Sequence, residues 1–403
     1  MGLLVGALSV LPGAVPAVAR DAAPGTYNQS RGTVSLTGRQ YGTTAADINA
    51  VLVSGGTLDL GGSTVTKSGD TTDLGNSRVY GQNAAVLAEY GAVIDLSDSE
   101  VVTDGTGAGG VFVTNDGSAL SVTGGRVTTS GSYSNGADAN LGATMSLRDV
   151  DVSTTGEQSA AAAATLADAR LTLTGGTATA TGPSSPALAS TGTLIASGTT
   201  IDSAEDYAAT VDGANALTLD HVTATGAAGG IRAFNSAGGT LRGSATVTVR
   251  GGSLDAGGGD AFRVDGTNAA LTVQDGAAIT ADGRLLTVLN GGTATLTALG
   301  GELTGDVVAT GGGNASVALT GGTALSGRAI GTALTLDAGS SWNVTADSAI
   351  TAFSDPGGIS GDTIANIAGN GHTVTYDPTL GANDDLGGRT YALQGGGSLR
   401  PAS

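Results

Sequence analysis

Short triplets, in which two aliphatic residues flank a polar or small one, recur along most of the chain. They are Leu58-Asp59-Leu60, Leu120-Ser121-Val122, Met145-Ser146-Leu147, Leu171-Thr172-Leu173, Leu217-Thr218-Leu219, Val247-Thr248-Val249, Leu271-Thr272-Val273 and Val317-Ala318-Leu319. Neighbouring triplets lie about 24 to 26 residues apart, and weaker matches near Leu194 and Leu296 fill the wider gaps. A period of two is typical of a β-strand with one buried face. We therefore predict one such strand in each repeat.

Two further strands are expected within each repeat. A Gly-rich turn and a second alternating run follow the triplet, as at Gly124 to Gly131. A third short run completes the repeat, and examples from other repeats are Gly110 to Val113 and Asp260 to Val264. Three strands in about 24 residues match one turn, or rung, of a right-handed parallel β-helix, an all-β solenoid. About 12 to 14 rungs at about 4.8 Å each predict a rod of about 60 Å. An antiparallel sandwich would not need this constant spacing.

Composition agrees with a solenoid that has little room for helices. The chain has 403 residues, with 70 glycines, 8 prolines and 3% aromatic residues, so small side chains must fill the interior. Glycine suits the corners, where left-handed backbone is needed, and Asn115-Asp116-Gly117 and Asp282-Gly283 are typical corner sequences. The alanine run Ala160 to Ala164 falls where a third strand is due, so we predict a narrow interior strand rather than a helix.

Charge and the chain's first residues bear on location and partners. A net charge of −19 opposes binding to nucleic acid, and the absence of cysteine excludes disulfides and thiol chemistry. Residues 1–19 are apolar and end in Ala17-Val18-Ala19, which resembles a truncated secretory signal peptide. We expect a repeat domain over 20–340 and C-terminal rungs with a cap over 341–403.

Two histidines, His221 and His372, are candidates for catalysis. His221 ends an alternating strand, where an outward polar residue is expected. Asn370-Gly371-His372 precedes Asn383-Asp384-Asp385, which invites comparison with pectin-degrading β-helix hydrolases. Those enzymes use a Gly-His-Gly element and an Arg-x-Lys element. In this chain the Gly-His lacks its second glycine, no Arg-x-Lys follows, and the order of the elements is reversed. We therefore expect a capping turn instead.

Three other patterns are candidates for ligand binding. A calcium-dependent lyase needs a carboxylate cluster that binds Ca²⁺ and a nearby base. The densest acidic cluster is Asp95, Asp98 and Glu100, and Arg126 lies about one rung later. Alternation, however, places Asp98 and Glu100 on a solvated face. The sequence Gly257-Gly258-Gly259-Asp260 resembles a calcium-binding nonapeptide but occurs once, so we predict a corner. The threonines at Thr128-Thr129, Thr179-Ala180-Thr181 and Thr223-Ala224-Thr225 could form an ice-binding ladder, but the pattern is not strict. We expect no catalytic, cofactor-binding or metal-binding residues.

The C-terminal part resembles the end of pertactin-like autotransporter passengers. The resemblance rests on Ser341-Trp342-Asn343-Val344-Thr345, on Asn366 to Asp377, and on Gly387 to Leu393 with Gly395-Gly396-Gly397. In that family a Trp-Asn-Val rung closes the regular helix, and the resemblance implies surface display, adhesion and a C-terminal cap. The family continues into a translocator barrel that this sequence does not include, so we expect either a truncated piece of such a protein or a barrel-less relative that is released or held at the outer membrane by another component.

The function expected from the sequence is that of a secreted or surface-exposed, non-catalytic adhesin of a Gram-negative bacterium. Its partner would be a surface glycan or protein ligand, with neither nucleic acid nor a cofactor. A polysaccharide-active lyase or hydrolase on the same fold is the alternative.

Overall fold

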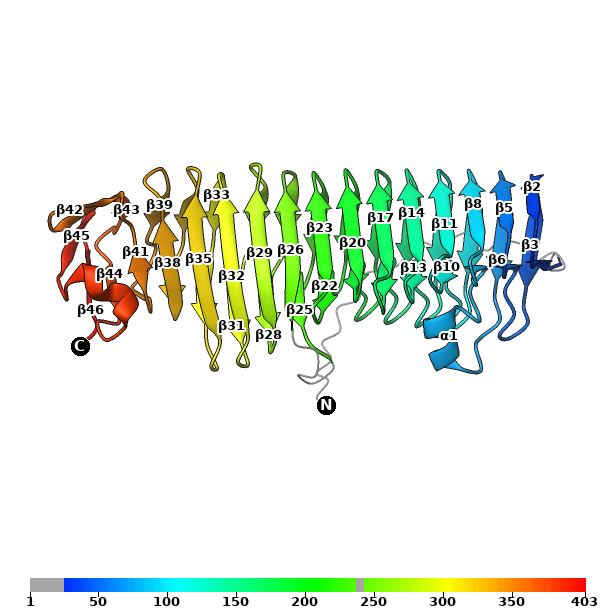
Figure 1. Ribbon diagram of the computed structural model, residues 1–403, viewed down its shortest axis with the longest axis horizontal. Helices are drawn as coiled ribbons and strands as arrows, with labels where there is room; N and C mark the ends of the chain where they lie inside the picture. Colours follow the sequence, from blue (N-terminus) through cyan, green and yellow to red (C-terminus); the bar gives the residue numbers. More distant parts are fainter. Residues whose placement is uncertain (1–24, 237–242) are drawn as a thin grey trace.

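The computed structural model describes residues 25–236 and 243–403, which form a long rod of about 15 turns (Figure 1). The predicted signal peptide, residues 1–19, lies outside these described residues. Nearly all strand pairs are parallel, and the described exceptions are β42 with β43 and β45 with β46, both near the C-terminal end. The predicted parallel β-solenoid is therefore confirmed, with slightly more rungs than the 12 to 14 expected.

The recurring triplets form one continuous sheet of 14 strands. Its strands, in spatial order, are β2 (Thr33–Thr37), β5 (Thr57–Gly61), β8 (Val93–Ser97), β11 (Ala119–Thr123), β14 (Thr144–Arg148), β17 (Arg170–Thr174), β20 (Thr193–Ser197), β23 (Ala216–Asp220), β26 (Ser244–Arg250), β29 (Asn268–Gln274), β32 (Thr293–Leu299), β35 (Asn314–Thr320), β38 (Thr332–Leu336) and β41 (Phe353–Ser354).

The second run of each repeat forms another ladder of parallel strands. These are β3 (Gln40–Thr43), β6 (Thr64–Lys67), β9 (Glu100–Thr103), β12 (Arg126–Thr129), β15 (Asp151–Thr154), β18 (Thr177–Ala180), β21 (Thr200–Ser203), β24 (Thr223–Gly226), β27 (Ser253–Asp255), β30 (Ala278–Thr280), β33 (Glu302–Thr304), β36 (Ala324–Ser326), β39 (Ser341–Asn343), β43 (Thr363–Ala368) and β45 (Tyr391–Gln394), with β42 (Ile359–Ser360) beside β43.

The third run of each repeat forms the remaining ladder. These are β1 (Tyr27–Gln29), β4 (Val51–Val53), β7 (Val86–Ala88), β10 (Val111–Thr114), β13 (Ala137–Asn140), β16 (Ala162–Thr165), β19 (Leu188–Ser190), β22 (Tyr207–Asp212), β25 (Gly229–Phe234), β28 (Asp260–Asp265), β31 (Arg284–Leu289), β34 (Asp306–Ala309), β37 (Ala329–Ile330), β40 (Ser348–Ala349), β44 (Thr373–Tyr376) and β46 (Ser398–Pro401).

Aliphatic side chains fill the interior in columns that follow the strand register. Leu58, Ile94, Leu120, Met145 and Leu171 face one another on successive strands of the 14-stranded sheet, and each is at most 1% exposed. Burying a side chain of this size stabilises the fold by about 1.5 to 3 kcal/mol relative to leaving it exposed. A regular column of such contacts explains why the triplets are the most visible feature of the sequence.

The turn after each triplet strand is built on left-handed backbone. Asp98, Gly124, Asp149 and Gly175 each follow a strand of the 14-stranded sheet, with φ between 45° and 68°. Glycine enters this conformation without strain, and Asp and Asn enter it more readily than most other residues. The corner therefore selects the residues that separate the first two strands of each repeat.

A different set of glycines is required by close stacking rather than by φ. Gly105, Gly131, Gly156 and Gly182 lie over one another in successive rungs, and a Cβ on Gly131 or Gly156 would lie 1.9 Å from the carbonyl oxygen of the glycine below. No side chain fits in that space. The sequence analysis expects glycine at corners. This column shows that some glycines are required instead by the close stacking of neighbouring rungs.

The alanine run adopts the predicted strand. Residues 162–165 form β16, and Ala160 to Ala164 are all at most 4% exposed. Packing between neighbouring rungs therefore overrides the helical propensity of alanine at this position.

Within residues 25–236 and 243–403, helices are nevertheless present at two places. The helix α1 (Leu74–Tyr80) is inserted between β6 and β7, and the 3-10 helix η1 (Gly381–Leu386) lies near the C-terminus. The insertion lengthens the rung between Leu58 and Ile94, so the expectation that helices have little room is wrong for that rung.

The last rungs, within residues 341–403, differ from the regular column. The Trp342 side chain is fully buried on β39, between Leu325 and Ile367 in register, and its indole N–H donates to the Gly327 carbonyl at 2.9 Å. After it, η1 and the antiparallel pair β45 and β46 close this end (Figure 1).

Candidate functional site

The outer face of the 14-stranded sheet carries a regular row of small polar side chains. We call the central outward position of each strand the outer row, which runs Ser35, Asp59, Asp95, Ser121, Ser146, Thr172, Ile195, Thr218, Thr248, Thr272, Thr297, Ala318, Thr335 and Ser354. Twelve of these fourteen side chains are Ser, Thr or Asp. The row therefore offers hydroxyl and carboxylate groups at the spacing of the strands, about 4.8 Å.

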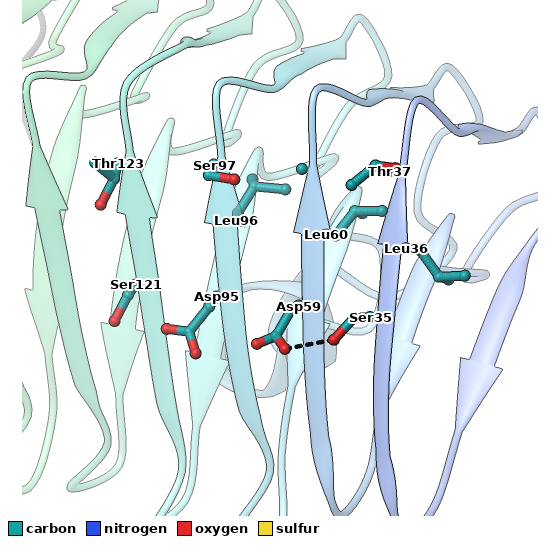
Figure 2. A pocket seen from close by; sticks show the side chains of 11 residues that line it. Ser35, Leu36, Thr37, Asp59, Leu60, Asp95, Leu96, Ser97, Ser121 and Thr123 are labelled. Atoms are coloured by element: carbon teal, nitrogen blue, oxygen red, sulfur yellow. Dashed lines mark hydrogen bonds between the residues drawn. The ribbon is translucent and has the colours of Figure 1, made fainter.

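A shallow depression of about 210 Å³ lies on this row near the N-terminal end of the rod (Figure 2). Figure 2 shows Ser35, Asp59, Asp95 and Ser121 on neighbouring strands, and the Ser35 hydroxyl donates to the Asp59 carboxylate at 2.7 Å. Gly61 also lines the depression, and its missing side chain leaves a gap between Thr37 and Ser97. The depression exposes two neighbouring carboxylates, Asp59 and Asp95, to a ligand lying along the rod.

The acidic cluster considered from the sequence does not converge on one point. Asp95 lies on the 14-stranded sheet, Asp98 lies at the corner with a φ of 45°, and Glu100 lies on β9. Glu100 pairs in register with Arg126 on the next rung, as predicted, and its carboxylate accepts from the Arg126 Nε at 2.9 Å. A second depression of about 410 Å³ borders this ion pair, which is solvent exposed.

His221 lies at a corner. Its φ is 50°, and Gly198 and Gly251, in the equivalent positions of the adjacent rungs, have φ of 57° and 55°. The imidazole Nδ1 lies 2.8 Å from the Asp220 carboxylate and the side chain is exposed. The outward position predicted for His221 is confirmed, and its place in the corner column gives it a structural role.

His372 and Asn383 have different structural surroundings. The His372 Nδ1 lies 3.7 Å from the Asp347 carboxylate. Asn383 is buried in η1, where its amide donates to the Thr351 carbonyl at 2.8 Å and its oxygen accepts from the Phe353 N–H at 2.9 Å. Asn383 thus attaches a turn of the cap to the last strand of the 14-stranded sheet, in agreement with the predicted capping turn.

The glycine run before Asp260 forms a corner, as predicted. Gly257 has a φ of 49°, and the Asp260 carboxylate accepts from the Arg284 N–H at 3.2 Å and lies 3.6 Å from Arg263. Across residues 25–236 and 243–403, no three or more His, Cys, Asp or Glu side chains are grouped so that they could hold a metal ion.

The adjacent pair Thr128-Thr129 is split between two faces, whereas the pairs separated by a buried alanine each lie on the outer side. Thr128, Thr179 and Thr225 lie in one outward column, with Ser153 and Asp202 between them, whereas Thr129 is buried and donates to the Ser134 carbonyl. The outward column is therefore interrupted, as the sequence indicates. The more continuous hydroxyl surface is the outer row, whose residues are the central positions of the alternating triplets and which the sequence alone does not identify as a site.

No protein-family model matches this chain, and no curated protein gives a significant match. Within the part of the chain that the structure describes, no helix is long and apolar enough to cross a membrane. The likeness to autotransporter passengers stays a prediction from residues such as Trp342 and Asn343.

Proposed function

We propose that this protein is an extracellular or surface-exposed, non-catalytic rod of the adhesin type, and that its outer row binds a neutral polysaccharide. The observation that carries the proposal is the outer row itself, in which Ser, Thr and Asp side chains follow one another in register along the 14-stranded sheet. The resemblance of the Trp342 rung to pertactin-like passengers supports the surface location.

The chemistry of the outer row suits a ligand rich in hydroxyl groups. Side-chain hydroxyls both donate and accept hydrogen bonds, and the carboxylates of Asp59 and Asp95 accept strong ones. Each contact is weak in water, but an extended ligand repeats it from strand to strand, so the contacts act together. The net charge of −19 disfavours an acidic polymer and favours a neutral one.

A polysaccharide-active enzyme is the alternative. It would require an acid and a base that converge on one glycosidic bond, or a carboxylate cluster beside a free base. Among the candidates that the structure describes, Glu100 is paired with Arg126 and Asn383 is engaged with backbone groups. No specific contact favours the enzyme, so we retain it as an outcome of the experiment.

The experiment is binding of the purified chain to a panel of insoluble neutral polysaccharides, with Asp95→Ala as the test variant. A hydrogen bond to a carboxylate is worth about 1.5 to 3 kcal/mol, so we expect Asp95→Ala to weaken binding about tenfold or more. Asp282→Ala removes one exposed carboxylate at a distant corner and should bind like the parent chain.

Two results would count against the proposal. One is the absence of binding to every polysaccharide in the panel, or equal binding by the parent chain and Asp95→Ala. The other is release of reducing ends or unsaturated products that Asp384→Ala abolishes, which would establish the enzymatic alternative.

A further inference from the structure

The α1 insertion covers part of the outer face of the third ladder. The Ser77 hydroxyl donates to the Gly107 carbonyl, and the Asn49 amide donates to the carbonyl of Gly81, the residue after α1, at 2.8 Å. The Asn140 amide on β13 reaches the Arg78 carbonyl of α1 at 3.1 Å. Figure 1 shows α1 outside the stack of strands. The insertion is therefore attached to several rungs, and β13 is one of its supports.

Side chains that alternation places in solvent are buried beneath this insertion. All four residues of β10 and all four of β13 are buried, and Phe112, Asp138 and Asn140 are 4%, 3% and 0% exposed. Phe112 packs with Leu87 in an apolar cluster outside the main core. Asp138 and Asn140 form the adjoining polar part of the same covered face.

Three buried oxygen atoms in this polar part have no hydrogen-bond partner. They are Thr114 Oγ1, Asp138 Oδ1 and Asn140 Oδ1, and they are three of the eight such side-chain atoms among the described residues. Thr114 and Asn140 are paired in register on adjacent strands, and Asp138 lies two residues before Asn140 on the same face. Buried polar atoms are nearly always satisfied, so this concentration calls for a ligand.

The orientation of the two amides leaves acceptor oxygens free beside the unpartnered Thr114 hydroxyl. The Asn140 nitrogen is committed to the Arg78 carbonyl, so its oxygen is the free end. Asn135 accepts from the Ala160 N–H at 2.9 Å and donates to Asp138 Oδ2 at 2.8 Å, which leaves Asp138 Oδ1 unpaired. The patch therefore contains a carboxylate oxygen, an amide oxygen and a hydroxyl oxygen, and each of these can coordinate a cation.

The positive side chain that acts on Asp138 is Arg78, and its charged group is placed elsewhere. The Arg78 guanidinium lies over the Tyr133 ring, 5.8 Å from its centre, and the residue is exposed. Burial raises the pKa of Asp138 to about 7, although Asn135, Thr165 and, least of all, Arg78 act to lower it. A buried carboxylate without a partner charge is costly to ionise.

We propose that Asp138, Asn140 and Thr114 bind a hard cation beneath α1, with Ca²⁺ as the best match. Carboxylate, amide and hydroxyl oxygens are ligands for hard cations, and Ca²⁺ accepts irregular geometry, whereas Mg²⁺ requires a small octahedral site. A single carboxylate indicates weak affinity, in the range of about 10⁻⁴ to 10⁻³ M that is typical of extracellular calcium modules. The sequence predicts no metal ligand here, because alternation alone would place Asp138 among solvated side chains.

The experiment measures calcium binding by the full chain after treatment with a chelator. Titration calorimetry with CaCl2 and the melting temperature in millimolar CaCl2 would be recorded for the parent chain and three variants. Asp138→Asn keeps the side-chain shape and removes the charge, and Thr114→Val removes one hydroxyl. Asp116→Asn is the matched control, because it removes an exposed carboxylate two residues from Thr114.

We expect calcium to bind at one site and to raise the melting temperature of the parent chain more than MgCl2 does. Asp138→Asn should weaken binding more than about tenfold, since the loss of the only carboxylate exceeds about 1.4 kcal/mol. Thr114→Val should weaken binding severalfold, and Asp116→Asn should bind normally. Absence of calcium binding by the parent chain would overturn the proposal and indicate ordered water at the three oxygens. Undiminished binding by both Asp138→Asn and Thr114→Val would also overturn it.

Discussion

The backbone N–H of Ser134 donates a hydrogen bond of 2.9 Å to the hydroxyl oxygen of Ser159, which occupies the same corner one rung later. The next rung repeats the contact, because the Ser159 N–H donates to the Ser185 hydroxyl at 2.9 Å. The Ser159 hydroxyl also donates to the Gly131 carbonyl, in the preceding rung, at 3.1 Å. A column of buried serines thus satisfies backbone groups at a corner that no strand pairing reaches.

Ser159→Ala should destabilise the rod. The substitution leaves the buried Ser134 N–H without an acceptor and removes a donor to Gly131, so we expect a loss of about 1 to 3 kcal/mol. Thermal and urea unfolding followed by circular dichroism would measure it. Ser153→Ala, on the outer face of β15, is the control and should stay within about 0.5 kcal/mol of the parent chain. Equal stability of the two variants would show that the serine column is not structural.

Gly131→Ala should be more damaging than most glycine substitutions in this chain. The new Cβ would lie 1.9 Å from the Gly105 carbonyl oxygen, so the two rungs would have to separate. We expect a cost of about 3 kcal/mol or more. Gly258→Ala is the matched control, because its Cβ would meet nothing within 4 Å. Comparable melting temperatures for the two variants would contradict the close stacking of the glycine column.

Trp342→Phe should weaken the C-terminal end of the rod. The Gly327 carbonyl loses its indole donor and the smaller ring leaves a gap, so we expect a cost of about 1 to 3 kcal/mol. Tyr90→Phe, at a position 70% exposed, should change stability little. Trp342 is the only tryptophan, so its fluorescence in the parent chain should report a buried indole that becomes solvated on unfolding. A solvent-exposed emission spectrum before unfolding would contradict the buried position.

Asp138 should make the stability of the calcium-free chain depend on pH. Its pKa is raised to about 7 by burial, compared with an ordinary value of about 3.9 in the unfolded chain. The folded state therefore holds this proton more tightly, and the free energy of unfolding should fall as pH rises from about 4 to about 7, by an amount on the order of a few kcal/mol, and then level off.

The contribution of Asp138 can be isolated by difference. Asp138→Asn cannot ionise, so the difference in unfolding free energy between this variant and the parent chain should grow in the variant's favour between those pH values. Other acids whose pKa is raised by partial burial, such as Glu89 and Asp206, are common to both chains, so their contributions cancel. A difference that is constant with pH would contradict the raised pKa.

The sequence predicted the regular part of the fold because its repeat is a direct consequence of packing. In Leu171-Thr172-Leu173 the two leucines face the interior and the threonine faces outward, and the equivalent residues of the next rungs do the same. The corner residues were also predictable, because left-handed backbone restricts them to glycine and a few polar residues. His221 is a less common occupant, and only the register shows that it belongs to that column.

The covered face under α1 was not predicted, because alternation assumes that the outer side of each strand meets solvent. Two signals were available, namely the long interval between Leu58 and Ile94 and the unbroken apolar run Val111-Phe112-Val113. Neither identifies Asp138 as buried, since its burial depends on a helix contributed by a different rung. The outer row was likewise present in the triplets, but its continuity depends on a register that the sequence alone does not provide.

The central claim is that successive rungs stack in register. Because the chain contains no cysteine, pairs of introduced cysteines test this claim most directly. Ser146 and Thr172 face each other on β14 and β17, whereas Thr174 lies opposite Arg148, two residues further along. Adjacent strands are about 4.8 Å apart, within the range of Cα separations that a disulfide spans, while the diagonal pair is separated by about 7 to 8 Å. Mild oxidation should therefore cross-link Ser146→Cys with Thr172→Cys rapidly and nearly completely, and should leave Ser146→Cys with Thr174→Cys mostly reduced. Preferential cross-linking of the second pair, or of neither, would contradict the register on which the rod is built.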